Sequence, residues 1–426
     1  MHIFDELLSD IQIPQFRRIR VSFNEQCIED IPAEIARRLT DSGVDKRITP
    51  GMRVCIAAGS RDIGEHALIV KTIVDYVYAL NASPFIIPAM GSHGGATAQG
   101  QQEVLESFGI TQETMGAPVL SSMETVEITQ TLDGQSVQMD KYAADADFII
   151  PVSRIKPHTD FRGRVESGMC KMLTIGLGKQ HGAYICHKRG FPNMPDTVWA
   201  VSSAIAEVKK NIVVLGIVEN AFHKACHIVA TPIEKVHSEE PILLEEAKRR
   251  IARFPFLKAD VLVVDEFGKD ISGAGMDPNI TGRSVLLPRA EPYFANIVVR
   301  DLTDATHGNV GGIGNADVIP RRVFDKISFE ASYPNAITAA DARGTMIPIV
   351  MPNDRLALQF AIRASIPSMG DEAPRVIWIQ NTLKLSEYYI SESLVALAKT
   401  LPDVEVIDEA PMRALFGNEG EFKGFA

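Results

Sequence analysis

Short apolar runs alternate along this chain with helical patterns, and this alternation constrains the fold more than any other feature. The runs are near-continuous in Val and Ile, which is typical of strands buried on both faces of a parallel sheet. Between the first two runs, Ile63, Ala67, Val70, Val74 and Val77 recur at spacings of three and four, as on one face of a helix. The expected strands are Arg53–Ala57, Phe85–Pro88, Phe148–Val152, Ile212–Val218, Val261–Asp265, Ile297–Arg300, Ile347–Met351, Val376–Gln380 and Val404–Ile407. The pattern predicts an α/β protein in which helices cover mostly parallel sheets.

A charged helix near the middle of the chain divides the expected strands into two sets. Its apolar residues Leu243, Leu244, Ala247 and Ile251 fall on one face of a helix expected over Pro241–Phe254. Another helix is expected over Thr97–Phe108, ending at Gly109. We therefore expect two α/β domains, residues 1–250 and 251–426, with the active site in a cleft between them.

The composition narrows the class of protein. Hydrophobic residues make up 46% and charged residues 23%, as in ordinary globular proteins. The formal net charge is -11 without a basic block, which argues against nucleic acid as the main partner. The five cysteines are scattered and form no CxxC pair, which suits a reducing compartment. The first residues lack a signal-peptide pattern, and no apolar run approaches the ~20 residues of a spanning helix. We expect a cytoplasmic protein with no membrane partner.

Reactive residue types are concentrated in one stretch, from Lys156 to Lys188, directly after an expected strand. The stretch contains His158, Arg162, Lys171, His181 and His187. Ser167 and Gly168 could present backbone amides to a phosphate, and Lys171 could lie under that phosphate or form a covalent bond to a cofactor. A loop held by a rigid strand is where chemistry is expected. A polar loop with scattered cations is a weaker explanation for so many reactive types within about thirty residues.

Two other loops in the first half also follow expected strands. Ser60 and Arg61 open a helix, where Arg61 could bind a carboxylate or phosphate through two parallel hydrogen bonds. The alternative is that Ser60 caps the helix and Arg61 pairs with a surface acid. His93 lies among Gly91, Gly94 and Gly95, and an imidazole titrates near neutral pH, which suits proton transfer. An exposed turn histidine is the alternative, but it would not need so much glycine.

In the second half, Glu266 and Lys269 follow an expected strand and could contribute to a site at its carboxyl end. A later glycine-rich segment, with Gly308, Gly311 and Gly314, does not make the GxGxxG pattern of a dinucleotide site. We expect that segment to shape a loop rather than to bind a nucleotide.

Taken together, these residues resemble the nickel-pincer lactate racemase family. The resemblance rests on Ser60-Arg61, His93, His158, the run Ser167-Gly168-Met169-Cys170-Lys171 and a later histidine, and it extends over roughly Arg53 to Asp317. The segment from Gly268-Lys269 to Asn279 looks like the second-domain part of the family's wider relatives. The run Ser167 to Lys171 with its upstream histidine is the most specific element.

The resemblance implies an isomerase, a racemase or epimerase of a 2-hydroxy acid. The family's cofactor derives from nicotinic acid mononucleotide and holds nickel, with one arm joined to a lysine and a histidine completing the coordination. By resemblance, Lys171 is the attachment site, and His187, sixteen residues later, is the nickel ligand, with His181 as runner-up. His93 and His158 are the two acid/base residues.

The resemblance also implies that Arg61 and Lys269 bind the substrate carboxylate. Partners expected on this basis are the 2-hydroxy acid and the proteins that make the cofactor, with a homo-oligomer left open. Ala58-Gly59-Ser60 replaces the more polar Asp-His-Thr of the racemases, Gly94 stands where an arginine is common, and Glu266 stands where a glutamine is expected. These departures concern the substrate more than the cofactor, and the glycines leave space for a 2-hydroxy acid bulkier than lactate, including a sugar acid.

Two other functions compete with the racemase hypothesis. An NAD-dependent oxidoreductase would need a glycine-rich turn after the first strand, but Ala57 to Arg61 contains only one glycine. A binding or sensor protein without the cofactor would have no use for Lys171, His93 and His158.

Overall fold

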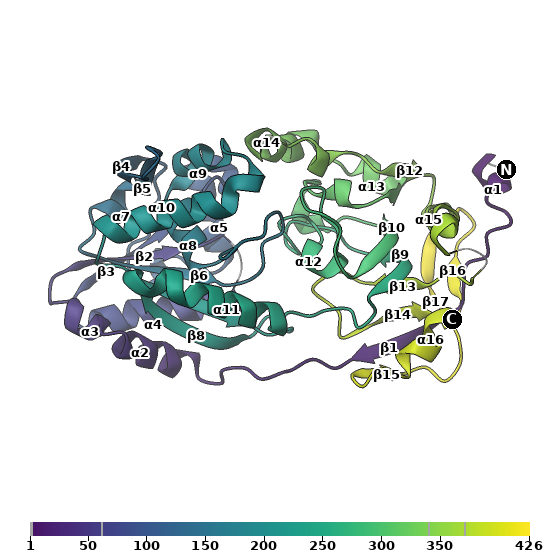
Figure 1. Ribbon diagram of the computed structural model, residues 1–426, viewed down its shortest axis with the longest axis horizontal. Coiled ribbons are helices and arrows are strands. Elements are labelled where there is room, and N and C mark those ends of the chain that lie inside the picture. Colours follow the sequence, from purple (N-terminus) through teal and green to yellow (C-terminus); the bar gives the residue numbers. More distant parts are fainter. Residues whose placement is uncertain (1–2, 61–62, 340, 370–371) are drawn as a thin grey trace. The chain divides into compact units, whose positions relative to one another are not determined.

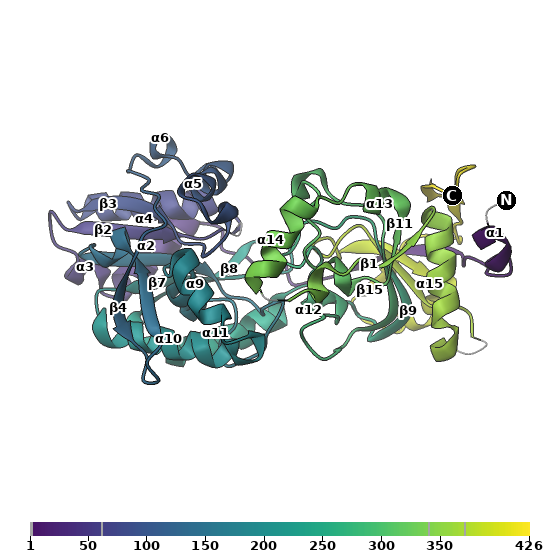
Figure 2. The ribbon, with the colours of Figure 1, turned by 90° about the horizontal axis from the view of Figure 1, so that it is seen from above.

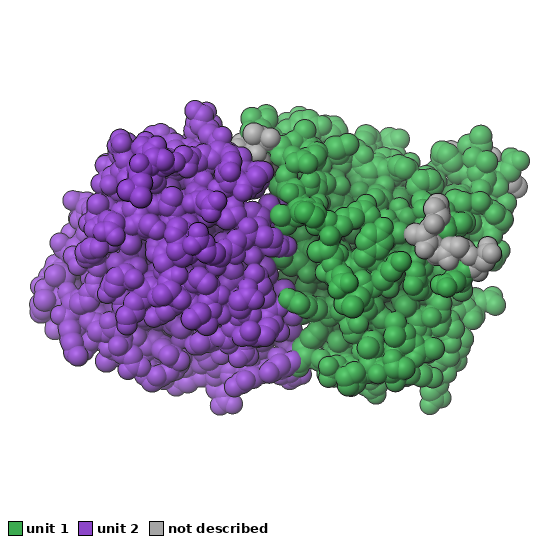
Figure 3. Space-filling model, in the orientation of Figure 1, with its two compact units in different colours: residues 1–23, 252–426 green, residues 24–251 purple. Residues whose placement is uncertain are grey.

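The computed structural model describes residues 3–60, 63–339, 341–369 and 372–426. The chain so described divides into two compact units, coloured separately in Figure 3: unit 1 comprises Met1–Phe23 and Ala252–Ala426, and unit 2 comprises Asn24–Ile251. The expected boundary near residue 250 lies beside the one between Ile251 and Ala252. The expected domain 1–250 differs in its first residues, because the segment up to Phe23 belongs to unit 1.

Unit 2 is built on a sheet that has five strands within the described residues, in the order β3-β2-β6-β7-β8 (Figure 1). Their bounds are β2 Arg53–Ala58, β3 Ser83–Pro88, β6 Phe148–Arg154, β7 Val213–Glu219 and β8 Ala225–Pro232. Neighbours from β3 to β7 are parallel, and β8 pairs with β7 in the antiparallel sense. Parallel neighbours deliver their following loops to one edge of the sheet, which is the usual ligand side of such folds.

Helices cover both faces of this sheet, as its apolar strands require. Along β2, Val54 and Ile56 belong to one core and Cys55 and Ala57 to the other, since successive side chains of a strand point to opposite faces. The helices of the first core are α2 Ile31–Asp41, α3 Val44–Arg47, α4 His66–Ala79, α5 Ala98–Ser107 and α6 Gln112–Met115. Those of the second core are α7 Lys141–Ala144, α8 Met169–Lys171, α9 Lys179–His187, α10 Met194–Val208 and α11 Val236–Arg250.

A hairpin of β4 (Thr125–Gln130) and β5 (Ser136–Asp140) is attached to unit 2. The two strands are antiparallel and extend side by side in Figure 2. The sequence analysis did not predict them, because Thr125–Gln130 is mostly polar and lies at the surface.

Unit 1 contains a second sheet, with eight strands among the described residues, in the order β12-β11-β10-β9-β13-β14-β1-β15. Strands from β12 to β13 are parallel, and β14, β1 and β15 continue the sheet in the antiparallel sense. Their bounds are β1 Phe16–Val21, β9 Lys258–Val264, β10 Tyr293–Val299, β11 Val318–Pro320, β12 Ile349–Met351, β13 Val376–Ile379, β14 Glu387–Ser391 and β15 Val404–Val406. The pairing of β1 with β14 and β15 explains why the segment up to Phe23 belongs to unit 1.

The remaining elements surround this second sheet. Helix α15 packs along it (Figure 2). The elements are α1 Ile3–Leu7, α12 Pro278–Thr281, α13 Arg321–Asp325, α14 Phe329–Ala339, α15 Asp354–Met369, α16 Glu392–Ala398, β16 Ala414–Phe416 and β17 Phe422–Phe425.

The predicted α/β class with mostly parallel sheets is confirmed. Two helix boundaries differ from expectation. Helix α4 begins at His66 rather than near Ile63, because Glu65 before it has a left-handed backbone with φ of 64°. The helix expected over Pro241–Phe254 is α11, which begins five residues earlier and holds Pro241 inside it. A proline is common at the start of a helix, and the start was therefore placed too late.

Candidate functional site

Three segments leave the same edge of the unit 2 sheet, because β3, β2 and β6 are parallel neighbours. Strand β2 leads to Ser60, β3 leads to the loop with His93, and β6 leads to the segment that begins at Lys156. Residues that are far apart in the sequence are thus brought to one edge. This edge is the candidate site of unit 2.

The glycines around His93 let the loop close tightly on helix α5. Gly94 has a left-handed φ of +63°, and a Cβ there would lie 2.6 Å from the backbone nitrogen of Gln101, so no larger residue fits. Thr97 caps α5 by accepting a hydrogen bond from the Gly100 N–H. The imidazole of His93 is exposed, and its Nδ1 is hydrogen-bonded to the hydroxyl of Ser60. The structure therefore brings Ser60 and His93, which follow neighbouring strands, into contact. Arg61, the residue after Ser60, lies outside the described residues.

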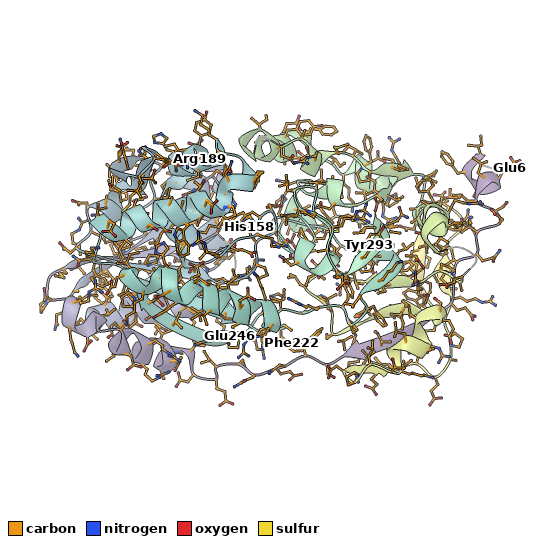
Figure 4. The ribbon with its side chains drawn as sticks, in the orientation of Figure 1. Glu6, His158, Arg189, Phe222, Glu246 and Tyr293 are labelled. Carbon is orange, nitrogen blue, oxygen red and sulfur yellow. The ribbon has the colours of Figure 1, made fainter. Side chains whose placement is uncertain are left out.

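His158 lies on the loop after β6, where Figure 4 labels it. Its side chain is buried and stacks on Phe161, with ring centroids 4.0 Å apart. The N–H of Asp160 donates to Nδ1 at 3.0 Å. A neutral imidazole whose Nδ1 accepts a hydrogen bond carries its proton on Nε2. The ring is therefore fixed in orientation, and Nε2 is the nitrogen that can exchange a proton.

Lys171 directly faces this nitrogen. Its Nζ lies 2.5 Å from Nε2 of His158, within hydrogen-bond distance. Lys171 ends the short helix α8 and is only partly buried. With its proton on Nε2, the imidazole donates this hydrogen bond to Lys171 in the neutral amine form, which is the form that acts as a nucleophile. The structure thus brings the predicted acid/base residue and the predicted attachment residue into contact.

Glu166 supports the His158 loop, although the sequence analysis did not single it out. Its carboxylate accepts a hydrogen bond from the His158 backbone N–H at 2.8 Å and lies 3.1 Å from Lys248 and 3.5 Å from Arg162. The side chain is 1% exposed, and a buried carboxylate of this kind is stable only with such partners. Glu166 is stabilised by Lys248, which lies far along the sequence. No pattern in the residues around Glu166 therefore indicates this role.

The Ser167–Gly168 turn is partly engaged within the protein. The N–H of Ser167 donates to the carbonyl of Lys156 at 3.1 Å, so this amide is used within the chain rather than presented to a phosphate. Gly168 is buried, and a Cβ there would overlap the carboxylate of Glu240. Glycine at this position is required by the close approach of Glu240.

Glu240 forms a hydrogen bond with the backbone of helix α8. It is completely buried, and its Oε2 accepts a hydrogen bond from the Cys170 N–H at 2.7 Å. Burial raises the pKa of Glu240 to about 7. Glu240 thus bonds to Cys170, the residue before Lys171. The sequence could not predict this contact, because the two residues are 70 positions apart.

After Lys171 the helix widens into a π-helical turn over Met172–Gly176, and α9 follows. Such turns are rare and often occur at functional sites. Helix α9 ends at His187, whose Nδ1 is buried and has no hydrogen-bond partner within the described residues. Burial and then the charge of Lys171 lower the pKa of His187. His187 is therefore a neutral imidazole near Lys171 with an unused nitrogen.

His181, also on α9, differs from His187. Its side chain is exposed, and its Nδ1 lies 3.3 Å from the hydroxyl of Thr125. Nothing in the described residues links His181 to Lys171.

Lys269 lies in unit 1, in the segment after β9. Its Nζ donates to the carbonyls of Gly273 at 2.6 Å and Gly311 at 2.7 Å. The expected carboxylate-binding ammonium group is thus used to hold its own loop and the glycine-rich segment around Gly311.

Neither a metal-binding cluster nor a membrane-spanning helix occurs among the residues that the structure describes. No group of three or more His, Cys, Asp or Glu side chains is arranged to hold a metal ion. No helix is both long and apolar enough to cross a membrane.

Comparison with solved structures identifies the type of fold. The structure is similar to the lactate racemase apoprotein from Thermoanaerobacterium thermosaccharolyticum, with a TM-score of 0.51 and 16% identity over 86% of this chain and 99% of that chain. A protein from Thermotoga maritima matches with a TM-score of 0.47 and 11% identity over 84% of this chain and 97% of that chain. No protein-family model and no curated protein matches the sequence. The chain is an α/β protein with a lactate racemase-like fold.

Proposed function

We propose that this protein is an isomerase, a racemase or epimerase of a 2-hydroxy acid, that works with a nickel-pincer nucleotide attached at Lys171. The proposal rests on the surroundings of Lys171, where His158 Nε2 lies at 2.5 Å and where the buried Nδ1 of His187 has no partner among the described residues. The lactate racemase-like fold supports the same function.

The residues of unit 2 fit a metal-bearing group that is bound through a lysine. Imidazole is a good ligand for nickel, and the buried Nδ1 of His187 has no other partner within the described residues. His187 is therefore our choice of nickel ligand over the exposed His181.

His158 has two tasks in the proposal. It donates its Nε2–H to Lys171 and so favours the neutral amine, the form that would bond to the cofactor. In the reaction it exchanges a proton with the substrate hydroxyl through the same nitrogen, whose orientation Asp160 fixes.

The bound cofactor would supply an acceptor for the Cα hydride, so that a planar 2-keto acid can receive the hydride back on either face. His93 serves the second face. Two bases are needed because the hydroxyl oxygen changes place when the configuration inverts. Ser60 orients the His93 ring through its hydroxyl, which holds Nδ1 and directs the other ring nitrogen to proton transfer.

The substrate carboxylate would be bound by Arg61 and Lys269. An ammonium group has three N–H donors, and Lys269 directs donors at Gly273 and Gly311. Carboxylate binding by Lys269 therefore requires it to exchange one of these carbonyls for the substrate. For the cofactor phosphate, the Ser167 hydroxyl and the Gly168 amide take the role, because the Ser167 amide is used by Lys156.

The partners in this proposal are the 2-hydroxy acid and the proteins that make the cofactor, in the cytoplasm. The protein would be co-expressed with a cofactor-synthesis system, purified and offered a panel of 2-hydroxy acids. Chiral separation should reveal interconversion of at least one pair of stereoisomers, with nickel retained by the protein. A nickel-free protein without a mass increase, in a system that loads a known racemase in parallel, would overturn the proposal.

A further inference from the structure

Lys179, the first residue of helix α9, is a fully buried lysine outside the set described so far. Its side chain has 0% exposure, and its Nζ donates to the carbonyl of Pro88 at 2.7 Å and to Oε1 of Gln101 at 2.6 Å. The carboxylate of Asp140 lies 3.6 Å away and neutralises the charge. The ammonium group therefore joins the end of β3, helix α5 and the end of β5.

This position is costly to maintain. Lys179 has a left-handed φ of 54°, which costs a non-glycine residue about 1–2 kcal/mol. Burying an ammonium group is also unfavourable unless it is paired and hydrogen-bonded. Burial lowers the pKa of Lys179 to about 8, and the opposing influence comes chiefly from Asp140 and also from Cys55. The contacts with Pro88, Gln101 and Asp140 stabilise Lys179 in this position, and Lys179 in turn fixes the positions of these three residues.

Gln101 connects Lys179 to the loop that contains His93. Its side chain is completely buried, with the oxygen bound by Lys179. The amide nitrogen donates to the carbonyl of Gly91 at 2.8 Å and to the carbonyl of His93 at 3.2 Å. An amide can make these contacts only with its oxygen toward Lys179, so the ammonium group fixes which way the amide points. The backbone of His93 is thus tied to a buried charge.

We propose that Lys179 is a positioning residue that, acting through Gln101, fixes the loop that presents His93 and ties it to helix α9, which ends at His187. Its importance for catalysis rests on the proposed function, whereas its hold on the loop does not. The two ends of this link are the proposed second acid/base residue and the proposed nickel ligand. One buried charge therefore ties the backbone of His93 to the first residue of the helix that ends at His187.

The test compares Lys179→Met, Gln101→Leu and Gln101→Glu in the protein without cofactor. Local amide hydrogen exchange is measured for residues 91–97, and thermal unfolding is measured alongside it. Loss of a hydrogen bond of about 1 kcal/mol should speed exchange in this loop roughly fivefold. Gln101→Glu is the sharpest variant, because it keeps an acceptor for Lys179 but has no N–H for Gly91 and His93. It should loosen the loop as much as Gln101→Leu.

Two matched controls use exposed neighbours. Gln102→Leu removes an exposed glutamine of α5 that binds Glu106, and Lys210→Met removes a lysine whose side chain is 62% exposed. Neither should change exchange in residues 91–97. Wild-type exchange in this loop in both Gln101 variants, in protein that remains folded, would overturn the inference even if Lys179→Met fails to fold.

The loaded enzyme gives a second readout. If the proposed function is correct, the Gln101 variants should lower kcat with little change in KM, because the loop positions a proton-transfer group rather than the substrate. A uniform loss of folded protein would lower the active fraction without this split and would count against positioning. Faster loop exchange in variants of a protein that binds no nickel would support the hold on the loop and overturn only the proposed function.

Discussion

Both units present loops at the carboxyl edge of a parallel sheet, but the two edges differ in how their charges are balanced. At the edge of unit 2, the Nδ1 of His187 is buried without a partner in the described chain, and Lys171 lies in hydrogen-bond contact with the imidazole of His158. At the edge of unit 1, cations are paired with carboxylates. Arg322 forms hydrogen bonds of 2.7 Å with both oxygens of Asp354, and Lys326 lies 2.7 Å from Asp301.

Unit 1 also has a pocket of about 470 Å³ at this edge, lined by Asp265, Glu266, Arg300, Asp301, Arg322 and Lys326 among others. Its arginines are paired with acids of the same unit, and its lining has more acids than cations. At the edge of unit 2, by contrast, the buried Nδ1 of His187 has no hydrogen-bond partner among the described residues. Both units thus have parallel strands that end at one edge of a sheet. The loops that follow these strands carry ion pairs in unit 1 and the contact between Lys171 and His158 in unit 2.

The largest expected effect concerns the two histidines of unit 2. His93→Ala and His158→Ala should each lower turnover of the loaded enzyme by about 10²–10⁴-fold, because each removes a group that transfers a proton. Activity is measured by chiral separation, with nickel content and circular dichroism recorded for the same samples. Two variants that retain full activity would break the distinction between the two edges.

The next effect tests the balanced edge of unit 1. Asp354→Asn should lower the free energy of unfolding by about 3–5 kcal/mol, because it leaves Arg300 and Arg322 beside a neutral group. Chemical denaturation measures the change. Asp304, an exposed acid that lines the same pocket, provides the control, and Asp304→Asn should stay within about 0.5 kcal/mol of wild type. Equal losses in both variants would contradict the account of this edge.

A somewhat smaller effect should depend on pH in unit 2. The folded pKa of Glu240 is about 7, against 4.5 for the free side chain. Between these values the folded protein holds a proton that the unfolded chain has lost, so stability falls as pH rises. The loss up to pH 8 amounts to about 3 kcal/mol. Glu240→Gln should remove this pH dependence while keeping an acceptor for Cys170, so its unfolding midpoint should exceed that of wild type at pH 8 but not at pH 4.5. A parallel pH dependence in both proteins would contradict the assignment.

The smallest expected effect separates the two histidines of α9. His181→Ala should change nickel content and turnover by less than about twofold, because an exposed side chain with one weak contact is removed. His187→Ala is the matched variant and should lose nickel from the loaded protein. Metal analysis of both variants decides the question, and loss of nickel only in His181→Ala would reverse the choice.

The sequence could predict the parts of the fold that depend on local pattern. The run Phe148–Val152 is continuous in apolar residues and forms most of β6, which is buried on both sides. Strand β1 was missed, because three of its six residues are arginines and its partner β14 lies more than 360 positions away. Its place in the sheet is set by pairing, not by its own composition.

The site divides in the same way. His93, His158 and Lys171 could be named from the sequence because they follow strands or stand among glycines. Glu166 and Glu240 could not, since each acts through a backbone N–H that only the folded chain brings near. Lys179 lies beside Gly178, but nothing local indicates that its ammonium group reaches Pro88, 91 positions earlier.

The central claim is that Lys171 carries a nickel-containing cofactor, and intact-protein mass spectrometry with metal analysis tests it most directly. Wild-type protein, Lys171→Ala and the exposed-lysine control Lys210→Ala would each be co-expressed with a cofactor-synthesis system. The account predicts an added mass and bound nickel in wild type and Lys210→Ala, and neither in Lys171→Ala. An added mass that persists in Lys171→Ala, or its absence from all three proteins while a known racemase is loaded in parallel, would contradict the claim.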